Sequence, residues 1–296
     1  MSDPEAVKLH SLLGDYPITE ALKKGNVRSA SVAFGFADVR PPSSGFKRVV
    51  RNLEFDFAEL AIVTFLLAKA AGKPLVLLPA VILGRFQHPF IVYNIERGPL
   101  APADLAGRRV GIRSYSVTTG AWVRGILARD YGVDLGRVTW VTFEEPHVAE
   151  FRDPPSVKRA PEGKELVAML LAGEVDAAIL GAVPTDPRLK PLIPDPEAAA
   201  RAWQKKYGAL QINHMVVVKE SLSKSNPRAV REIYRQLAES KKAAGLPKPG
   251  ELDTNPFGVE ANRRNLEIAI DYVHGQGMIP RRFAVDELFD DVTRAL

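Results

Sequence analysis

The stretch Pro102-Ala-Asp-Leu-Ala-Gly-Arg-Arg-Val-Gly-Ile112 organises the fold of this 296-residue chain. Its first half predicts a turn of helix that ends at a glycine, and residues 109–112 have the apolar pattern of a short strand. A polar loop at residues 113–120 follows this strand and opens a helix at residues 121–131. A strand that leads through a polar loop into a helix is typical of α/β proteins.

The same alternation of strands and helices continues on both sides of this stretch. Upstream, we expect strands at residues 7–13, 29–36, 75–83 and 90–93, and helices at residues 18–24, 45–51 and 57–71. Downstream, we expect strands at residues 138–143, 175–180 and 211–218, and helices at residues 164–172, 196–207, 227–244, 259–274 and 284–295. The sequence therefore predicts an α/β fold that ends in a series of helices.

The composition is that of a globular protein, with 46% hydrophobic and 25% charged residues. The 40 Lys and Arg residues exceed the 35 Asp and Glu residues by five, and the two signs are interleaved along the chain. This pattern argues against nucleic-acid binding and suits a pocket that collects a small anion. The absence of cysteine excludes disulfides, thiolate metal sites and a cysteine nucleophile.

The N-terminal residues lack the pattern of a secretory signal peptide. Met1-Ser2-Asp3-Pro4-Glu5 carries acids where a signal peptide has basic residues, and no apolar stretch of signal-peptide length follows. The longest uncharged apolar stretches, residues 60–68 and 74–84, are too short to span a bilayer. We therefore expect a cytoplasmic protein that does not act at a membrane.

Two phrases divide the chain into lobes. Pro102–Ile112 resembles the segment by which the chain leaves the first lobe in type II periplasmic-binding-protein folds. The segment Leu171-Ala-Gly-Glu-Val-Asp-Ala-Ala-Ile179 resembles a helix-to-strand connection in their second lobe. The resemblance implies a first lobe made of residues 1–105 and 215–296, and a second lobe made of residues 106–214. A ligand is then expected in the cleft between the lobes, where the carboxyl ends of strands converge.

The loop Arg113-Ser-Tyr-Ser-Val-Thr-Thr-Gly120 is a candidate carboxylate site. Backbone N–H groups at a helix N-terminus bind anions, and Arg113 adds a positive charge. The hydroxyls of Ser116, Thr118 and Thr119 could bind a ligand here, or they could only cap the helix. The loop as a whole favours ligand binding because it follows a strand on the expected cleft.

Five further residues are candidates for the functional site, and each could instead have a purely structural role. Arg85 and His88 follow a buried strand, and a guanidinium suits a carboxylate while an imidazole suits acid–base work, although both could be exposed loop residues. His214 lies in an apolar strand at the expected return crossover, where it is either a core histidine or a residue of the cleft floor. Glu59 opens an apolar helix, and Asp15 follows the first strand; either could simply stabilise a helix N-terminus.

No spacing of His, Asp and Glu matches a metal site, and neither a glycine-rich phosphate loop nor a nucleophile elbow occurs. We therefore expect no metal and no cofactor.

Several segments together are similar to the 4,5-dihydroxyphthalate decarboxylases. They are Gly14-Asp-Tyr16, Phe55-Asp-Phe-Ala-Glu-Leu60, Arg85-Phe-Gln-His88, Val110-Gly-Ile-Arg-Ser-Tyr-Ser-Val-Thr-Thr-Gly-Ala-Trp-Val-Arg-Gly-Ile-Leu127 and the strand that begins Asn213-His-Met-Val-Val. The resemblance spans most of the chain and thins in the C-terminal helices. It implies a carboxy-lyase that releases CO2 from a dihydroxylated phthalate and gives protocatechuate.

Such a reaction needs a base for a phenolic proton, an acid for the ring carbon that bears the carboxylate, and cations for the remaining charge. We expect His214 to be the acid, His88 or Glu59 to be the base, and Arg85 with the loop at residues 113–119 to hold the carboxylates. The alternative is a solute-binding protein that holds a small aromatic or other carboxylate without turnover. The oligomeric state is left open, with a homo-oligomer among the alternatives.

Overall fold

The computed structural model describes residues 6–296, which divide into two units, each built around its own sheet. Unit 1 comprises the residues up to Arg85 together with Ile212–Ile270 and Ile279–Leu296. Unit 2 comprises Phe86–Gln211 and Asp271–Met278. The expected α/β fold class is confirmed, since each sheet carries helices between its strands.

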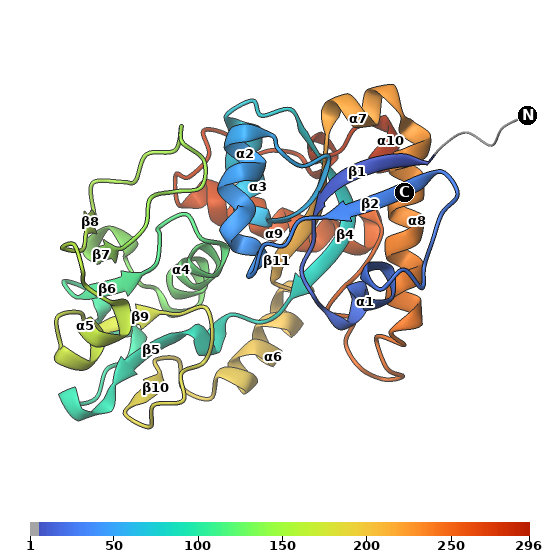
Figure 1. The fold of residues 1–296 in the computed structure, drawn as a ribbon. Coiled ribbons are helices and arrows are strands. Elements are labelled where there is room, and N and C mark those ends of the chain that lie inside the picture. The colour runs from blue at the N-terminus through green and yellow to red at the C-terminus, as the bar shows by residue number, and fades with distance from the viewer. Residues whose placement is uncertain (1–5) are drawn as a thin grey trace, which may run out of the picture. The chain divides into compact units, whose positions relative to one another are not determined.

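The sheet of unit 1 has the strand order β2-β1-β3-β11-β4 (Figure 1). Its strands are β1 (Val7–Leu12), β2 (Val32–Phe36), β3 (Phe57–Ala61), β4 (Leu75–Gly84) and β11 (Ile212–Lys219). Strand β1 runs parallel to both β2 and β3, whereas β11 is inserted antiparallel between β3 and β4. The central strands therefore come from parts of the chain that are far apart in sequence.

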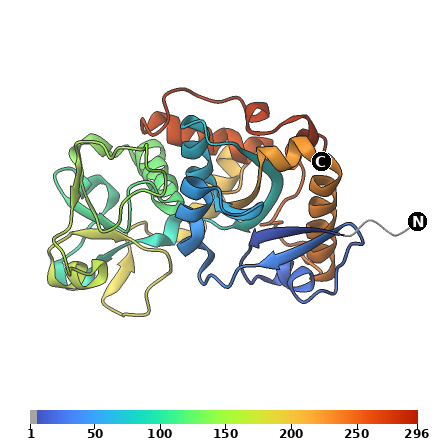
Figure 2. The ribbon, with the colours of Figure 1, turned by 45° about the horizontal axis from the view of Figure 1, so that its top comes forward.

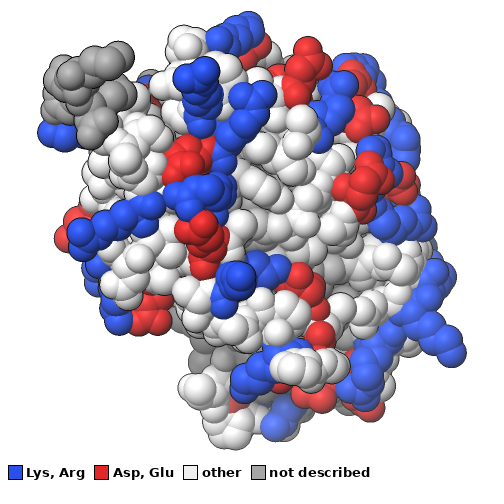
Figure 3. Space-filling view, turned by 90° about the vertical axis from the view of Figure 1, so that its right-hand side faces the viewer, with Lys and Arg blue, Asp and Glu red and all other residues white. Residues whose placement is uncertain are grey.

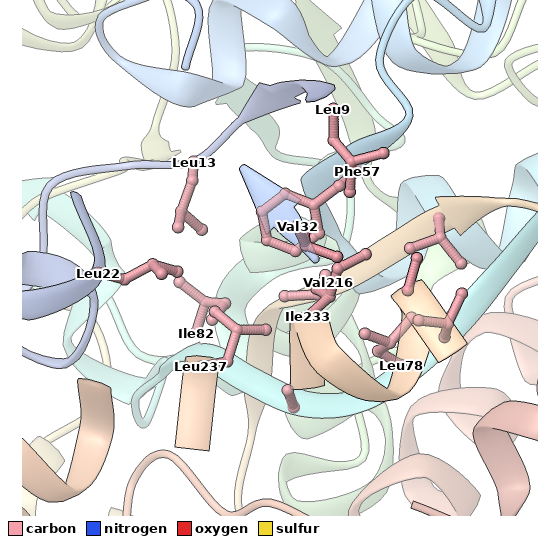
Figure 4. Close-up of a cluster of buried hydrophobic side chains, with 14 of the residues drawn as sticks. Leu9, Leu13, Leu22, Val32, Phe57, Leu78, Ile82, Val216, Ile233 and Leu237 are labelled. Atoms are coloured by element: carbon pink, nitrogen blue, oxygen red, sulfur yellow. The ribbon is translucent and has the colours of Figure 1, made fainter. Parts of the chain in front are cut away.

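Helices α1 (Pro17–Lys23) and α8 (Pro227–Ala243) pack together against this sheet (Figure 2). Helix α8 begins where the Asn226 side chain accepts a hydrogen bond from the backbone N–H of Ala229, and Pro227 occupies its first position. Its buried residues Val230, Ile233 and Leu237 recur at helical spacing and pack into the core of unit 1. In Figure 4 this core joins residues of α1 and α8 to Phe57, Leu78 and Val216 of the sheet.

The helical segments of unit 1 range from single turns to the 17 residues of α8. They are α1 (Pro17–Lys23), η1 (Pro42–Gly45), α2 (Phe46–Asn52), α3 (Ile62–Ala70), α7 (Glu220–Ser225), α8 (Pro227–Ala243), α9 (Val259–Gly275, of which the residues up to Ile270 belong here), η6 (Val285–Leu288) and α10 (Asp291–Arg294). Basic and acidic side chains both occur across the face in Figure 3. On α8, Arg235 pairs with Glu232 and Glu239.

Two helix predictions in unit 1 are wrong. Residues 57–71, expected as one helix, form strand β3 and then helix α3, because a segment that is apolar on every face lacks the periodicity that separates a buried strand from a buried helix. Residues 284–295, also expected as one helix, form η6 and α10. The break at Asp290 arises because its side chain caps α10 by accepting a hydrogen bond from the backbone N–H of Thr293.

The sheet of unit 2 has the strand order β10-β5-β9-β6-β7-β8 (Figure 1). Its strands are β5 (Ile91–Asn94), β6 (Arg109–Ile112), β7 (Thr139–Thr142), β8 (Val157–Arg159), β9 (Ala177–Ile179) and β10 (Leu189–Pro191). Strands β9, β6, β7 and β8 are parallel, so their carboxyl ends meet at one edge. The helical segments are η2 (His88–Phe90), η3 (Ile95–Arg97), η4 (Pro102–Leu105), α4 (Thr118–Tyr131), η5 (Leu135–Arg137), α5 (Leu166–Ala172) and α6 (Pro196–Tyr207).

Unit 2 begins at Phe86, whereas the sequence places the start of the second lobe after residue 105. The difference arises because β5 pairs with β9 and β10 and therefore belongs to the second sheet. Unit 2 also gains residues 271–278, where Tyr272 packs its ring against Trp122 at a centroid distance of 5.4 Å. Among residues 6–296, no helix has the length and apolar character needed to cross a membrane.

Candidate active site

The carboxylate of Glu59, on β3, joins three segments of unit 1. Its side chain is fully buried, and its two oxygens accept three hydrogen bonds. Oε2 accepts from the backbone N–H of Gly14 at 2.8 Å, and Oε1 accepts from the Tyr16 hydroxyl at 2.7 Å. The Nδ1 atom of His214 lies 2.6 Å from the same Oε1. An ionised carboxylate can only accept, so with Glu59 ionised Nδ1 of His214 is the donor in this bond.

The register of two antiparallel strands brings Glu59 and His214 together. Val216 of β11 lies opposite Glu59, and His214 lies opposite Ala61. Residues two apart on a strand share a face, so His214 is the diagonal neighbour of Glu59 on that face. The ring of Phe46 meets the imidazole edge-on at a centroid distance of 5.2 Å, and the His214 side chain is 14% exposed.

Gly14 and Tyr16 reach Glu59 from the turn between β1 and α1. A Cβ atom on Gly14 would lie 2.6 Å from the Tyr16 ring, 2.7 Å from Pro42 and 2.9 Å from Oε2 of Glu59. Only glycine therefore lets the backbone N–H approach the carboxylate at this position. The Thr19 hydroxyl accepts from the backbone N–H of Tyr16 and donates to the Gly14 carbonyl, which fixes the turn.

Arg85 follows β4 and interacts electrostatically with Tyr16. Burial lowers the pKa of Arg85 from its usual value, yet arginine stays charged in proteins. Burial, reinforced by the negative charge of Glu59, raises the pKa of Tyr16 above its usual range. Unit 1 thus combines a cation with a histidine–glutamate pair and a tyrosine that remains protonated.

Asp15 and His88, two further residues predicted from the sequence, interact with residues other than Glu59. The Asp15 carboxylate is more than half exposed and pairs with Lys23 and Arg40, and the Lys23 interaction lowers its pKa. His88 belongs to unit 2 and is 1% exposed beside the rings of Phe86 and Trp203. Burial lowers the pKa of His88 to about 4, and its Nδ1 atom has no hydrogen-bond partner among residues 6–296.

Unit 2 has a cavity of about 430 Å³ at the carboxyl ends of its parallel strands. Arg113, Phe143 and Leu180, which follow β6, β7 and β9, line this cavity together with Thr119 in the first turn of α4. The Arg113 guanidinium pairs with Glu144 at 3.0 Å, so its positive charge is partly neutralised. The candidate loop and the N-terminus of α4 therefore lie beside an open cavity.

The other hydroxyls of this loop are buried. Ser116 and Thr118 are 2% and 3% exposed, and the Ser116 hydroxyl lies 3.4 Å from that of Ser114. No side chain caps α4 at its N-cap residue, Val117. The N-cap position is thus occupied by an apolar residue rather than by one of these hydroxyls.

Arg124, a fully buried cation on α4, was not among the residues predicted from the sequence. Its guanidinium donates to the Tyr115 carbonyl and to Oε1 of Gln276, each at 2.8 Å, and stacks 3.7 Å from the Tyr115 ring. It thereby supports the loop that precedes α4. Its place in the phrase Ala121-Trp-Val-Arg-Gly-Ile-Leu127, which is apolar apart from this arginine, is the signal that could have identified it.

Comparison with solved structures identifies the fold class of this chain. The chain is similar to the periplasmic aliphatic sulphonate binding protein SsuA from Escherichia coli, with a TM-score of 0.57, 15% identity, and coverage of 97% of this chain and 92% of that one. It is also similar to the desulfurization enzyme DszB, with a TM-score of 0.55, 14% identity, and coverage of 97% and 98%. The chain thus has the type II periplasmic-binding-protein fold.

Sequence comparison identifies the family. A 4,5-dihydroxyphthalate decarboxylase from Comamonas testosteroni is 29% identical over 251 residues, covering 80% of this chain and 76% of that protein. One from Pseudomonas putida is 31% identical over 212 residues, covering 67% and 82%. No protein-family model matches the chain. The chain belongs to the 4,5-dihydroxyphthalate decarboxylase family, as the sequence analysis expected.

Proposed function

We propose that this protein is a carboxy-lyase that decarboxylates a hydroxylated aromatic carboxylate without oxidation, with 4,5-dihydroxyphthalate as the substrate to test first. The family relationship supports the reaction class. The observation that carries the proposal is the hydrogen bond between Nδ1 of His214 and the buried carboxylate of Glu59.

The reaction exchanges a carboxylate for a proton at one ring carbon. A base removes the proton from the hydroxyl para to the departing carboxylate, and an acid protonates the carbon that bears this carboxylate. The bond from the ring to CO2 then breaks, and its electron pair restores the aromatic ring as a phenolate. The phenolate takes its proton back from the base, which regenerates the hydroxyl. One proton is consumed at carbon, one CO2 is released, and protocatechuate is the product when the substrate is 4,5-dihydroxyphthalate.

His214 is suited to be the acid in this scheme. Because Nδ1 donates to Glu59, the exchangeable proton is at Nε2, and the negative carboxylate stabilises the imidazolium that forms. A general acid in this role typically contributes about 10²–10⁴-fold to the rate.

The remaining roles are assigned as follows. The candidate carboxylate-binding group of unit 1 is Arg85. In unit 2 the candidates are the Ser116–Thr119 segment and the Arg113 guanidinium, which is the weaker because Glu144 already pairs with it. Of the two candidate bases, Glu59 has to stay ionised to stabilise the His214 imidazolium. This favours His88, whose imidazole is neutral at pH 7. Asp15 already pairs with Lys23 and Arg40, so we propose no substrate contact for it.

The test is to mix the purified protein with 4,5-dihydroxyphthalate and to follow CO2 release and ultraviolet absorbance. His214→Gln should retain binding within a few-fold while the chemical step falls by about 10²–10⁴-fold. The control is His274→Gln, which changes an exposed histidine on α9 and should leave the rate unchanged. A wild-type protein that gains thermal stability with the ligand but releases no CO2 would instead be a solute-binding protein.

A further inference from the structure

We infer that Tyr16 is a positioning residue, whose hydroxyl holds the Glu59 carboxylate so that the His214 imidazolium can release its proton. This inference rests on the proposed function, because it assigns a task within that reaction. Neither the resemblance nor the comparisons assign a role to this tyrosine.

The geometry places two donors on one oxygen atom. The Tyr16 hydroxyl lies 2.7 Å from Oε1 of Glu59, and Nδ1 of His214 lies 2.6 Å from the same atom. Each donor draws negative charge toward itself, so the tyrosine reduces the charge available to the imidazole. Without the hydroxyl, the charge on Oε1 would stabilise the imidazolium more strongly, and Nε2 of His214 would be a weaker acid toward carbon.

The backbone and ring of Tyr16 are held in place so that its hydroxyl donates to Glu59. Its backbone N–H donates to the Thr19 hydroxyl at 3.0 Å at the start of α1, and its ring lies 2.6 Å from the position that a Cβ on Gly14 would take. Burial and the Glu59 charge keep the hydroxyl protonated, because they raise the pKa of Tyr16. The tyrosine is therefore a permanent donor to Glu59 and takes no part in proton exchange.

The neighbouring residues strengthen the assignment. Gly14 occupies Oε2 through its backbone N–H, so a second fixed donor prevents the carboxylate from rotating. Arg85, the proposed carboxylate-binding cation, interacts electrostatically with Tyr16. Tyr16 thus links the group that would bind the substrate to the pair that would protonate it.

The experiment compares Tyr16→Phe with Tyr234→Phe, which removes a hydroxyl from another half-buried ring of unit 1, in tilted contact with Phe257. A hydrogen bond to a charged group corresponds to about ten- to a hundredfold in rate. Tyr16→Phe should therefore lower kcat by about ten- to a hundredfold while KM and the melting temperature stay close to those of the control. In a Glu59→Gln background the same change should have little effect, since the charge it acts on is absent.

Nuclear magnetic resonance tests the contact without relying on turnover. The Nδ1 proton of His214 is assigned by its loss in His214→Gln, and in Tyr16→Phe it should move downfield as its bond to Glu59 strengthens. An unmoved resonance with an unchanged kcat would overturn the inference, as would equal effects of Tyr16→Phe with and without Glu59. A wild-type protein that releases no CO2 overturns the proposed function instead, and the resonance then decides the Tyr16–Glu59–His214 contact by itself.

Discussion

Glu59 is a residue whose burial needs an explanation. A carboxylate taken out of water costs several kcal/mol, and unit 1 offsets this cost with the Gly14 N–H, the Tyr16 hydroxyl and the His214 imidazole. A core position of this kind is more simply filled by an apolar side chain. That the chain keeps a charge there agrees with a task in proton transfer.

The charge of Glu59 can be tested without changing its shape. Glu59→Gln keeps an oxygen for Gly14 but presents an uncharged amide to His214, so the imidazolium loses its stabilising partner. We expect the rate of decarboxylation to fall by about 10²–10⁴-fold. Steady-state kinetics with ligand affinity measured in parallel checks this, and a variant as active as the wild type would remove Glu59 from the mechanism.

Gly14 is required by a close approach rather than by its backbone angles. Gly14→Ala would place a methyl group within 3 Å of Tyr16, Pro42 and Glu59, so one of them must move. We expect a loss of about 1–3 kcal/mol in the free energy of unfolding together with a lower kcat. Gly35→Ala, whose new Cβ would meet only the Leu9 carbonyl at 3.7 Å, is the control for chemical denaturation. Equal stability of the two variants would contradict this account.

At this scale the sequence identified members of the site but not their contacts. Glu59 and His214 were proposed separately, because their meeting depends on the register of β3 and β11, which neither segment encodes alone. Next to the first strand the sequence favoured Asp15, yet Tyr16 contacts Glu59 while Asp15 pairs with Lys23 and Arg40. A carboxylate is the more familiar site residue, and which of two adjacent side chains points inward is set by the turn at Gly14.

At the scale of elements, the periodicity of apolar residues predicted amphipathic helices such as α6. It failed for segments whose side chains are buried on every face. Helix α6 was predicted at its observed bounds, because its exposed and buried residues alternate with helical spacing. The segment at residues 57–71 was predicted as one helix, although its first five residues form β3, because almost all of its side chains are buried. The short strands β8 and β10 were missed, since three residues are too few to show a pattern.

The segment η2 gives unit 2 a dependence on pH. Burial lowers the pKa of His88 to about 4, whereas an unfolded histidine titrates near 6.5. Between these pH values the unfolded chain binds more protons than the folded chain. The contribution of the neutral His88 to the free energy of unfolding is therefore complete above pH 6.5 and is lost as the pH falls toward 4. This corresponds to about 3 kcal/mol in the free energy of unfolding.

His88→Phe should remove that part of the pH dependence, because the replacement ring fits beside Phe86 and Trp203 and does not titrate in this range. Chemical denaturation of both proteins between pH 4 and 7 gives the difference directly. Parallel profiles for the variant and the wild type would show that His88 is not buried in its neutral form.

At the scale of the molecule, neither unit is a continuous piece of chain. The chain passes between the units after Arg85, Gln211, Ile270 and Met278, and these four crossings join the two cores covalently. All three tryptophans, Trp122, Trp140 and Trp203, belong to unit 2. Tryptophan fluorescence therefore follows unit 2, while circular dichroism follows the helices of both units.

This separation of signals tests cooperativity. Leu78→Ala removes a fully buried side chain from the core of unit 1 and should cost about 2–5 kcal/mol in the free energy of unfolding. If the crossings make the molecule unfold as one, the fluorescence and dichroism transitions should coincide and shift together. A fluorescence midpoint that stays in place while the dichroism curve splits would show that the units unfold independently.

The position of β11 has a consequence for biosynthesis. This strand is inserted between β3 and β4, yet it is made about 130 residues after β4. Every strand of the second sheet lies between Ile91 and Pro191, so that sheet can assemble on the ribosome while the first sheet still has a gap. His214 arrives with the strand that fills the gap. A nascent chain interrupted before this point thus carries Glu59, Gly14 and Tyr16 but cannot form the pair with His214.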